Sequence, residues 1–298
     1  MVSQRPDYVK VNDLLNFINA RSSQNLSPRS LASQYLHVNT EDLVSRVSSG
    51  DGIWSLSARD IIKIDENLVV KCGPLTVQGL EEAATVQTVR QFTSIPVPEI
   101  IRVHAKGPKM YIFMSYIPGS TLQDMWPALD TKEKQNISDQ LKAYMDELRA
   151  VPSPSPCYFG SPKTHTCIDS RQLTRENIGE DRLISSEEEF NRFIATDLSS
   201  DYPTEYYNMI LSMMRQDHKV VLTHGDFHPR NIIIKDGAVT GIIDWECAGW
   251  YPEYWEYVKA LTSVGPVVDW WRYLPTIVGT YYAEWAINRQ LEKVMVMR

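Results

Sequence analysis

The sequence lacks any apolar run of about 18 residues, the length that a helix needs to cross a bilayer, so no membrane span is expected. Residues 1–13 also lack the apolar stretch of a signal peptide. No Cys-x-x-Cys pair occurs, and the four cysteines stand far apart, at positions 72, 157, 167 and 247. Because neither a zinc site nor a disulfide framework is indicated, we expect reduced thiols and a cytoplasmic protein.

Basic residues are not in excess, since 30 Lys and Arg stand against 37 Asp and Glu, for a formal net charge of -7. Proteins that bind duplex DNA usually carry a basic stripe that neutralises phosphates, and none is visible here. No nucleic-acid partner is therefore expected. The chain is 43% hydrophobic and 22% charged, which is typical of a globular protein with a packed core.

The hydrophobic pattern of the chain changes near Ile117. Before this point, short β-rich runs surround one predicted helix over residues 78–93, and two helical segments, 7–20 and 26–49, precede them. After this point the chain is predicted to be mainly helical, with a last helix over 266–290.

These segments predict an α+β protein in three parts. Residues 1–50 are expected to form a helical extension, residues 51–116 a small lobe with an antiparallel sheet, and residues 117–298 a mainly helical lobe.

The strongest local signal is a hairpin around Asp236–Gly237, a two-residue pair typical of a tight turn between strands. In this register Asn231 and Asp244 emerge at the same open end of the hairpin, and Asp226 enters that end on the preceding loop. Carboxylate and amide oxygens suit Mg²⁺. We therefore predict Asn231 and Asp244 as magnesium ligands and Asp226 as the catalytic group that receives a hydroxyl proton. The alternative is structural, with a turn aspartate and two caps at a hairpin end.

The order His224–Gly225–Asp226, then Asn231, then Ile243–Asp244 resembles the aminoglycoside phosphotransferase-like family, which includes choline-kinase-type enzymes. The resemblance covers roughly residues 50–290. It implies a bilobal, protein-kinase-like fold with a small antiparallel-sheet N-lobe and a mainly helical C-lobe. It also implies magnesium-dependent transfer of the γ-phosphate of ATP, with GTP left open, to a hydroxyl of a small metabolite or antibiotic. We expect a monomer or a weak homodimer.

A lysine in an apolar strand is the candidate for binding the nucleotide phosphates. Lys71 ends the run Leu68–Val69–Val70, where an ammonium is costly to bury without a partner. The resemblance points to Glu82 on the following helix as that partner, and the neighbouring Glu81 stays an alternative. The structural alternative is an edge-strand lysine beside a solvated helix.

No glycine-rich phosphate loop is present, so the sequence gives weaker signals for the other residues of the nucleotide site. Ser57 lies between the first two strands, where a loop would cover the phosphates. The segment with Ser115, Tyr116 and Ile117 resembles the hinge between kinase lobes, whose backbone would bind the adenine edge. The alternative for this hinge is a core strand that enters a turn.

Several residues near Asp226 have open roles. We expect His224 to support the loop, whereas His228 is either a solvent-side histidine or a substrate contact. Arg230 is expected to be solvated, with a phosphate contact as the alternative. Glu253 and Glu256 would attract an acceptor that carries a cationic amine, and aromatic side chains would add cation–π attraction.

Two other functions compete with a small-molecule kinase. One is a repurposed or inactive member of the fold that still binds nucleotide, which the weak glycine loop favours. The other is a protein kinase, which the sequence disfavours because Asp244 precedes Trp245–Glu246 instead of Phe–Gly. The loop before Pro252 is also too short for an activation segment.

Overall fold

The computed structural model describes residues 8–24, 31–35, 37–56, 59–155, 157–165, 167, 183–196, 202–262 and 269–296. The chain divides into two compact units, which we call the N-terminal and the C-terminal unit. The N-terminal unit consists of residues 1–119 and 240–246, and the C-terminal unit of residues 120–239 and 247–298. A short late segment of the sequence therefore belongs to the N-terminal unit.

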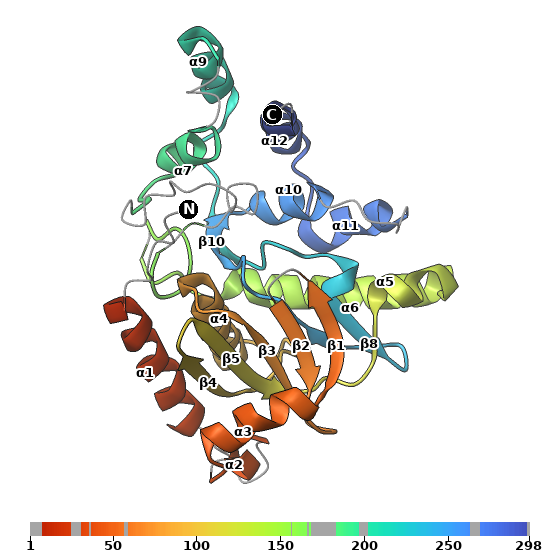
Figure 1. Ribbon diagram of the computed structural model, residues 1–298. Coiled ribbons are helices and arrows are strands. Elements are labelled where there is room, and N and C mark those ends of the chain that lie inside the picture. The colour runs from red at the N-terminus through yellow and green to blue at the C-terminus, as the bar shows by residue number, and fades with distance from the viewer. Residues whose placement is uncertain are drawn as a thin grey trace. The chain divides into compact units, whose positions relative to one another are not determined.

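The N-terminal unit is built on a five-stranded sheet in the order β1-β2-β3-β5-β4 (Figure 1). All neighbouring strands run antiparallel. The strands are β1 (Asp51–Leu56), β2 (Arg59–Lys63), β3 (Leu68–Pro74), β4 (Ile100–Lys106) and β5 (Lys109–Ser115). The central position of β3 places its middle residues between two neighbours, so this strand is a rigid support for a functional side chain.

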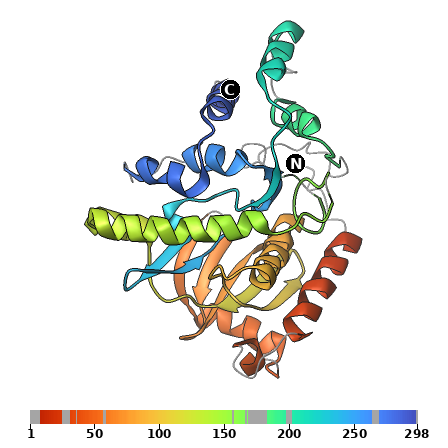
Figure 2. The ribbon, with the colours of Figure 1, turned by 180° about the vertical axis from the view of Figure 1, so that it is seen from behind.

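In the described part of this unit, the sheet is accompanied by the helices α1 (Tyr8–Gln24), α2 (Leu31–Tyr35), α3 (Thr40–Arg46) and α4 (Val77–Phe92). Helix α1 packs against α4 and β4, as Figure 2 shows from behind. The side chain of Thr76 caps α4 by accepting a hydrogen bond from the Gly79 N–H. Leu43 on α3 is fully buried in a cluster with Leu68 and Phe113 of the sheet. The early helices therefore share a hydrophobic core with the strands.

The single helix predicted over residues 26–49 is wrong. The chain forms α2 and α3 as separate helices there, followed by a 3₁₀ turn, η1 (Val47–Ser49). Asn39 separates them because its side chain accepts the N–H of Glu41 at 2.8 Å and so caps a new helix. Residues 25–30 lie outside the described part of the chain.

Asp65, in the turn between β2 and β3, ties this turn to the early helices. Its Oδ1 accepts the N–H groups of Asn67 at 3.0 Å and Leu68 at 2.9 Å. Its Oδ2 accepts the hydroxyl of Tyr35 at 2.8 Å and the guanidinium of Arg46 at 2.7 Å. One carboxylate thus shapes the turn and holds α2 and α3 to it.

The C-terminal unit is mainly helical around α6 (Thr131–Ala150), which contacts α11 and β7. Asp130 and Glu133 form a capping box at the start of α6. The other helices among the described residues are α5 (Leu122–Met125), η2 (Trp126–Ala128), α7 (Glu187–Ile194), α9 (Thr204–Met213), η3 (Pro229–Asn231), α10 (Trp255–Thr262), α11 (Trp270–Val278) and α12 (Tyr282–Val296). Buried aromatic side chains such as Phe190, Tyr251 and Trp255 fill the core between them.

Two small sheets carry the loops of this unit. One pairs β7 (Val220–Thr223) with β10 (Gly249–Pro252) in antiparallel register. The other has the order β6-β8-β9, with β6 (Ser120–Thr121), β8 (Ile232–Lys235) and β9 (Ala238–Ile242), which continues into the segment 240–246. Asp236 and Gly237, both with positive φ of 51° and 76°, form the predicted tight turn between β8 and β9.

The prediction of one continuous helix over residues 266–290 is also wrong. Gly279, at a φ of 82°, ends α11 and its N–H bonds to the carbonyl of Pro275 at 3.0 Å. Helix α12 then begins at Tyr282. A glycine at this position allows a left-handed backbone that other residues rarely adopt, so the chain changes direction here. The described helices include none that is long and apolar enough to span a membrane.

Candidate active site

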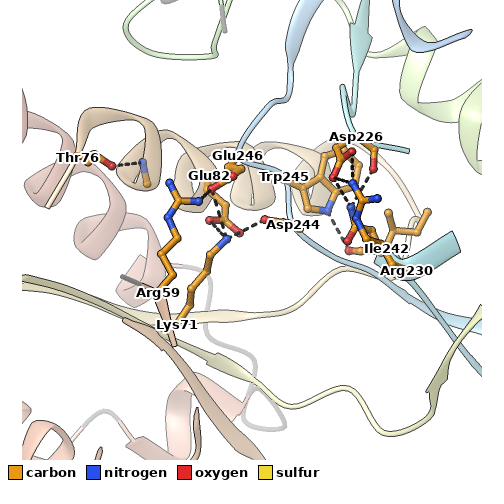
Figure 3. Close-up of polar contacts among 12 residues, drawn as sticks. Arg59, Lys71, Thr76, Glu82, Asp226, Arg230, Ile242, Asp244, Trp245 and Glu246 are labelled. Carbon is orange, nitrogen blue, oxygen red and sulfur yellow. Dashed lines mark hydrogen bonds and ion pairs between the residues drawn. The ribbon is translucent and has the colours of Figure 1, made fainter. Parts of the chain in front are cut away.

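Lys71 in β3 gathers three acidic residues of the N-terminal unit around its ammonium (Figure 3). Its Nζ lies 2.7 Å from Glu82 Oε2, 2.8 Å from Asp244 Oδ1 and 3.7 Å from Glu246 Oε2. The Lys71 side chain is only 12% exposed. The acidic partner on α4 is therefore Glu82, which decides between the two glutamates that the sequence left open.

The charges in this cluster depend on one another. Burial alone would lower the pKa of Lys71, but the carboxylates of Glu82, Asp244 and Glu246 raise it well above its ordinary value. Burial raises the pKa of Glu82 to about 7, although the ammonium of Lys71 opposes this shift. The three carboxylates therefore favour the charged form of Lys71 at a defined place on the sheet.

Asp244 reaches Lys71 because the segment 240–246 is fastened to the N-terminal unit. The N–H of Ile242 donates to the carbonyl of Pro96 at 2.8 Å. Within the segment, the fully buried ring of Trp245 donates from Nε1 to the carbonyl of Ile242 at 2.9 Å. Between Ile242 and Trp245, Asp244 has a φ of 66°, a strained conformation for a residue with a side chain. Such strain is common where a side chain must be aimed at a functional partner.

Arg59 and Glu246 add an ion pair that the sequence analysis missed. The Arg59 guanidinium, at the start of β2, binds Glu246 Oε2. The signal in the sequence was weak, because the two residues are 187 positions apart. Oxygen atoms of Glu82, Asp244 and Glu246 lie within 4.8 Å of one another. A set of carboxylate oxygens is the donor chemistry that Mg²⁺ prefers, so these residues fit a hard cation.

The expected adenine-binding segment already uses two of its N–H groups. The Ser115 N–H donates to the carbonyl of Glu99 at 2.9 Å, and the Tyr116 N–H donates to the carbonyl of Asn67 at 2.7 Å. Ile117 packs against Gly241, where a Cβ would come within 2.6 Å of Ile117 Cδ1. An adenine bound to this segment would have to form its hydrogen bonds with the remaining backbone groups. Ser57 lies outside the described residues.

Asp226, in the C-terminal unit, has hydrogen-bond donors on both carboxylate oxygens (Figure 3). One guanidinium nitrogen of Arg230 lies 2.6 Å from Oδ1 and 2.7 Å from Oδ2. The Asn231 amide donates to Oδ2 at 2.8 Å and to the Asp226 main-chain oxygen at 2.9 Å. The nitrogen of the Asn231 amide is thus turned toward Asp226, which leaves its oxygen as the atom to offer a cation.

A buried carboxylate holds the backbone before Asp226. Glu256 on α10 accepts the N–H of His224 at 2.6 Å and the N–H of Gly225 at 3.1 Å. Burial raises the pKa of Glu256, and nearby His224 and Arg149 oppose the shift. The idea that Glu256 attracts a cationic acceptor is wrong, because this side chain is enclosed and holds the loop instead.

The two loop histidines also have structural contacts. His224 is fully buried, and its Nδ1 accepts the N–H of Asp226 at 3.2 Å, which agrees with the expected supporting role. His228 is buried as well, and its side chain caps η3. The hypothesis that His228 is a solvent-side residue is therefore wrong. Gly225 has a φ of 77° and lies so close to the carbonyl of Cys247 that a Cβ would be 2.3 Å from it.

The structure brings the predicted residues together in two groups. Lys71, Glu82 and Asp244 meet in the N-terminal unit, and Asp226 and Asn231 meet in the C-terminal unit. The predicted meeting of Asn231 with Asp244 joins different units and stays a prediction.

A comparison with protein families identifies the family to which this chain belongs. The sequence profile of the phosphotransferase enzyme family matches residues 60–290. The chain belongs to this family. The match includes both groups of candidate residues but not helices α1, α2 and α3. No curated protein matches the phosphotransferase in sequence.

Solved structures with similar folds include aminoglycoside phosphotransferases. A thermostable mutant of APH(4)-Ia, in a ternary complex with ADP and hygromycin B, is 14% identical with a TM-score of 0.58, covering 86% of this chain and 90% of that chain. The streptomycin-ATP-APH(2'')-IIa ternary complex is 13% identical with a TM-score of 0.54, at 90% and 88% coverage. ADP-bound APH(2'')-Ib is 16% identical with a TM-score of 0.57, at 88% and 86% coverage. The phosphotransferase therefore has the expected α+β, protein-kinase-like fold.

Proposed function

We propose that this phosphotransferase transfers the γ-phosphate of ATP to a hydroxyl group of a small molecule. The observation that carries the proposal is the grouping of Lys71 with Glu82 and Asp244, 11 and 173 positions away in sequence. A lysine held by a helix glutamate and an aspartate suits the binding of nucleotide phosphates and their metal. The nucleotides in the similar structures, ADP and ATP, support this choice, and GTP remains a second donor to test.

Five of the candidate residues have roles in this proposal. Lys71 binds the α- and β-phosphates, and Glu82 keeps its ammonium in place. Asp244 and the amide oxygen of Asn231 would hold Mg²⁺, which neutralises charge on the phosphates when it is bound. Asp226 orients the acceptor hydroxyl and receives its proton, on a loop that Glu256 holds through two backbone N–H groups.

Measurement of ADP release in the presence of Mg²⁺ tests this function. The acceptors to screen are sugars, amino alcohols, amines and antibiotics. The Asp226→Ala variant should lower turnover at least about 100-fold, because the general base and its positioning are lost. Asp146→Ala, which removes an exposed carboxylate on α6, is the matched control and should leave turnover unchanged. An active Asp226→Ala enzyme would contradict the role of Asp226.

A nucleotide-binding member without transfer activity is the second candidate. The absence of a glycine-rich phosphate loop from the sequence favours it. Tight ATP binding without ADP release across the same panel would support this candidate. Absence of nucleotide binding at millimolar ATP in folded protein would contradict both candidates.

A further inference from the structure

We propose that Arg230 selects the acceptor, and that this acceptor carries no positive charge next to its reacting hydroxyl. The inference rests on the proposed function, in which Asp226 orients that hydroxyl. Arg230 places a guanidinium nitrogen within 2.7 Å of both oxygens of Asp226. A ligand group that reaches this carboxylate therefore also meets a cation.

The backbone keeps this guanidinium close to Asp226. Arg230 lies in η3, which starts at Pro229 and is capped by the buried His228. The Asn231 N–H donates to the carbonyl of His228 at 2.8 Å and closes this turn. The Arg230 side chain is 41% exposed, so it can adjust to a ligand while its origin stays fixed.

The nearby carboxylates offer little surplus negative charge to a cationic ligand. Asp226 is balanced by Arg230 and also accepts the amide of Asn231. Glu256 is enclosed and accepts two backbone N–H groups. Burial raises the pKa of Tyr281, and the nearby carboxylate of Glu253 raises it further. Both glutamates that the sequence suggested for attracting an amine therefore already face polar groups of the C-terminal unit.

The guanidinium of Arg230 carries a positive charge. The guanidinium of Arg230 would repel an ammonium group that approached Asp226. To bind there, the ammonium would have to displace this guanidinium from the Asp226 carboxylate. At a partly exposed site this repulsion should weaken binding at least about tenfold. A neutral or acylated substituent at the same position avoids the repulsion.

Matched pairs of compounds that differ only in this charge test the inference. The pairs are glucosamine and N-acetylglucosamine, ethanolamine and N-acetylethanolamine, and hygromycin B and its N-acetylated form. Calorimetry with Mg²⁺ and AMP-PNP present measures binding of each compound, and ADP release with ATP is measured in parallel. In the wild-type protein the acetylated member should bind at least about tenfold more tightly in every pair that binds.

Variants of Arg230 assign the effect to this residue. Arg230→Gln should bring the affinity ratio of each pair close to one, and Arg230→Glu should reverse the preference. For compounds that are turned over, the change should appear in KM and less in kcat. Arg192→Gln is the matched control, because Arg192 forms a similar ion pair with Glu188 four residues away, at 2.7 Å on α7. This control should keep the wild-type ratio.

Tighter binding of the amines, or a ratio that Arg230→Gln leaves unchanged, would overturn the inference. Absence of binding by both members of all pairs would overturn it as well. Failure of the proposed function has a different result: the ratio depends on Arg230, but no compound causes ADP release. The two ideas can therefore fail separately.

Discussion

The ammonium of Lys71 lies 2.8 Å from Oδ1 of Asp244, a residue 173 positions later in the chain. One residue stands on the central part of a sheet, and the other stands on a segment that returns to the same unit after the hairpin of β8 and β9. The contact brings a cation and a carboxylate to the same point. A nucleotide with its metal needs both kinds of group.

Replacing Lys71 should weaken nucleotide binding and destabilise the N-terminal unit. Lys71→Met removes the cation that Glu82 and Asp244 share, and it leaves a buried carboxylate without a partner. We expect at least about tenfold weaker ATP binding and a loss of about 3 kcal/mol in the free energy of unfolding. Nucleotide titration and urea denaturation measure the two effects. Lys142→Met, which removes the lysine of an exposed ion pair with Asp146, is the control. Unchanged ATP affinity in Lys71→Met would exclude Lys71 from the nucleotide site.

Removing the charge of Glu256 should reduce turnover through the loop before Asp226. In Glu256→Gln, an amide replaces a carboxylate that accepts the N–H groups of His224 and Gly225, so one N–H loses its acceptor. We expect a loss of about 2 kcal/mol in stability and a fall in kcat of at least about tenfold. Glu188→Gln, on the exposed side of α7, should have neither effect. A stable variant with wild-type kcat would show that this anchor is unimportant for Asp226.

Substitution of Gly225 and Gly237 by Ala should separate the cost of steric crowding from the cost of a positive φ, because the two glycines have similar backbone conformations. Gly225 and Gly237 have φ of 77° and 76°, but a Cβ at Gly225 would lie 2.3 Å from the carbonyl of Cys247, whereas a Cβ at Gly237 meets no atom within 4 Å. Gly237→Ala should therefore cost about 1 kcal/mol, from the backbone alone. Gly225→Ala should cost about 3 kcal/mol or more and lower ADP release, because the loop must move. Equal costs in urea denaturation would contradict the close packing at Gly225.

The hydrogen bonds of Asp65 should give the N-terminal unit stability that depends on pH. Burial alone would raise the pKa of Asp65, but donors from Asn67, Tyr35, Arg46 and Leu68 lower it below its ordinary value of 3.8. A carboxyl whose folded pKa is lowered contributes stability above its unfolded pKa and loses it as pH falls through the folded value.

Asp65→Asn should accordingly cost about 1 kcal/mol at pH 7, a modest figure because solvent screens this partly exposed group. The difference from the wild type should shrink below pH 3.8. Urea denaturation from pH 2.5 to 7 measures this, with the exposed Asp139→Asn as the control. A difference that grows as the pH falls would have the wrong sign and would contradict the assignment.

Features encoded by neighbouring residues could be predicted from the sequence. The tight turn at Asp236–Gly237 follows from two residues that accept positive φ, and both have it. Lys71 stood out because a lysine in an apolar strand needs a partner, and the structure supplies one at 2.7 Å. The family resemblance likewise came from a short motif with a regular spacing, and it predicted the fold.

Contacts between distant segments could not be predicted in this way. Only the tertiary structure decided that Arg59 binds Glu246 and that Glu256 faces the backbone of the loop. The contact of Lys71 with Glu82, which the family resemblance favoured over Glu81, is confirmed. The tertiary structure also decided that Arg230 contacts Asp226 rather than solvent alone. The physical reason is that the residue types of a chain determine local turns and strands, whereas the partner of a charged side chain depends on which surfaces pack together. The sequence by itself determined the chemistry available to this protein, and its folding determined which charges balance one another.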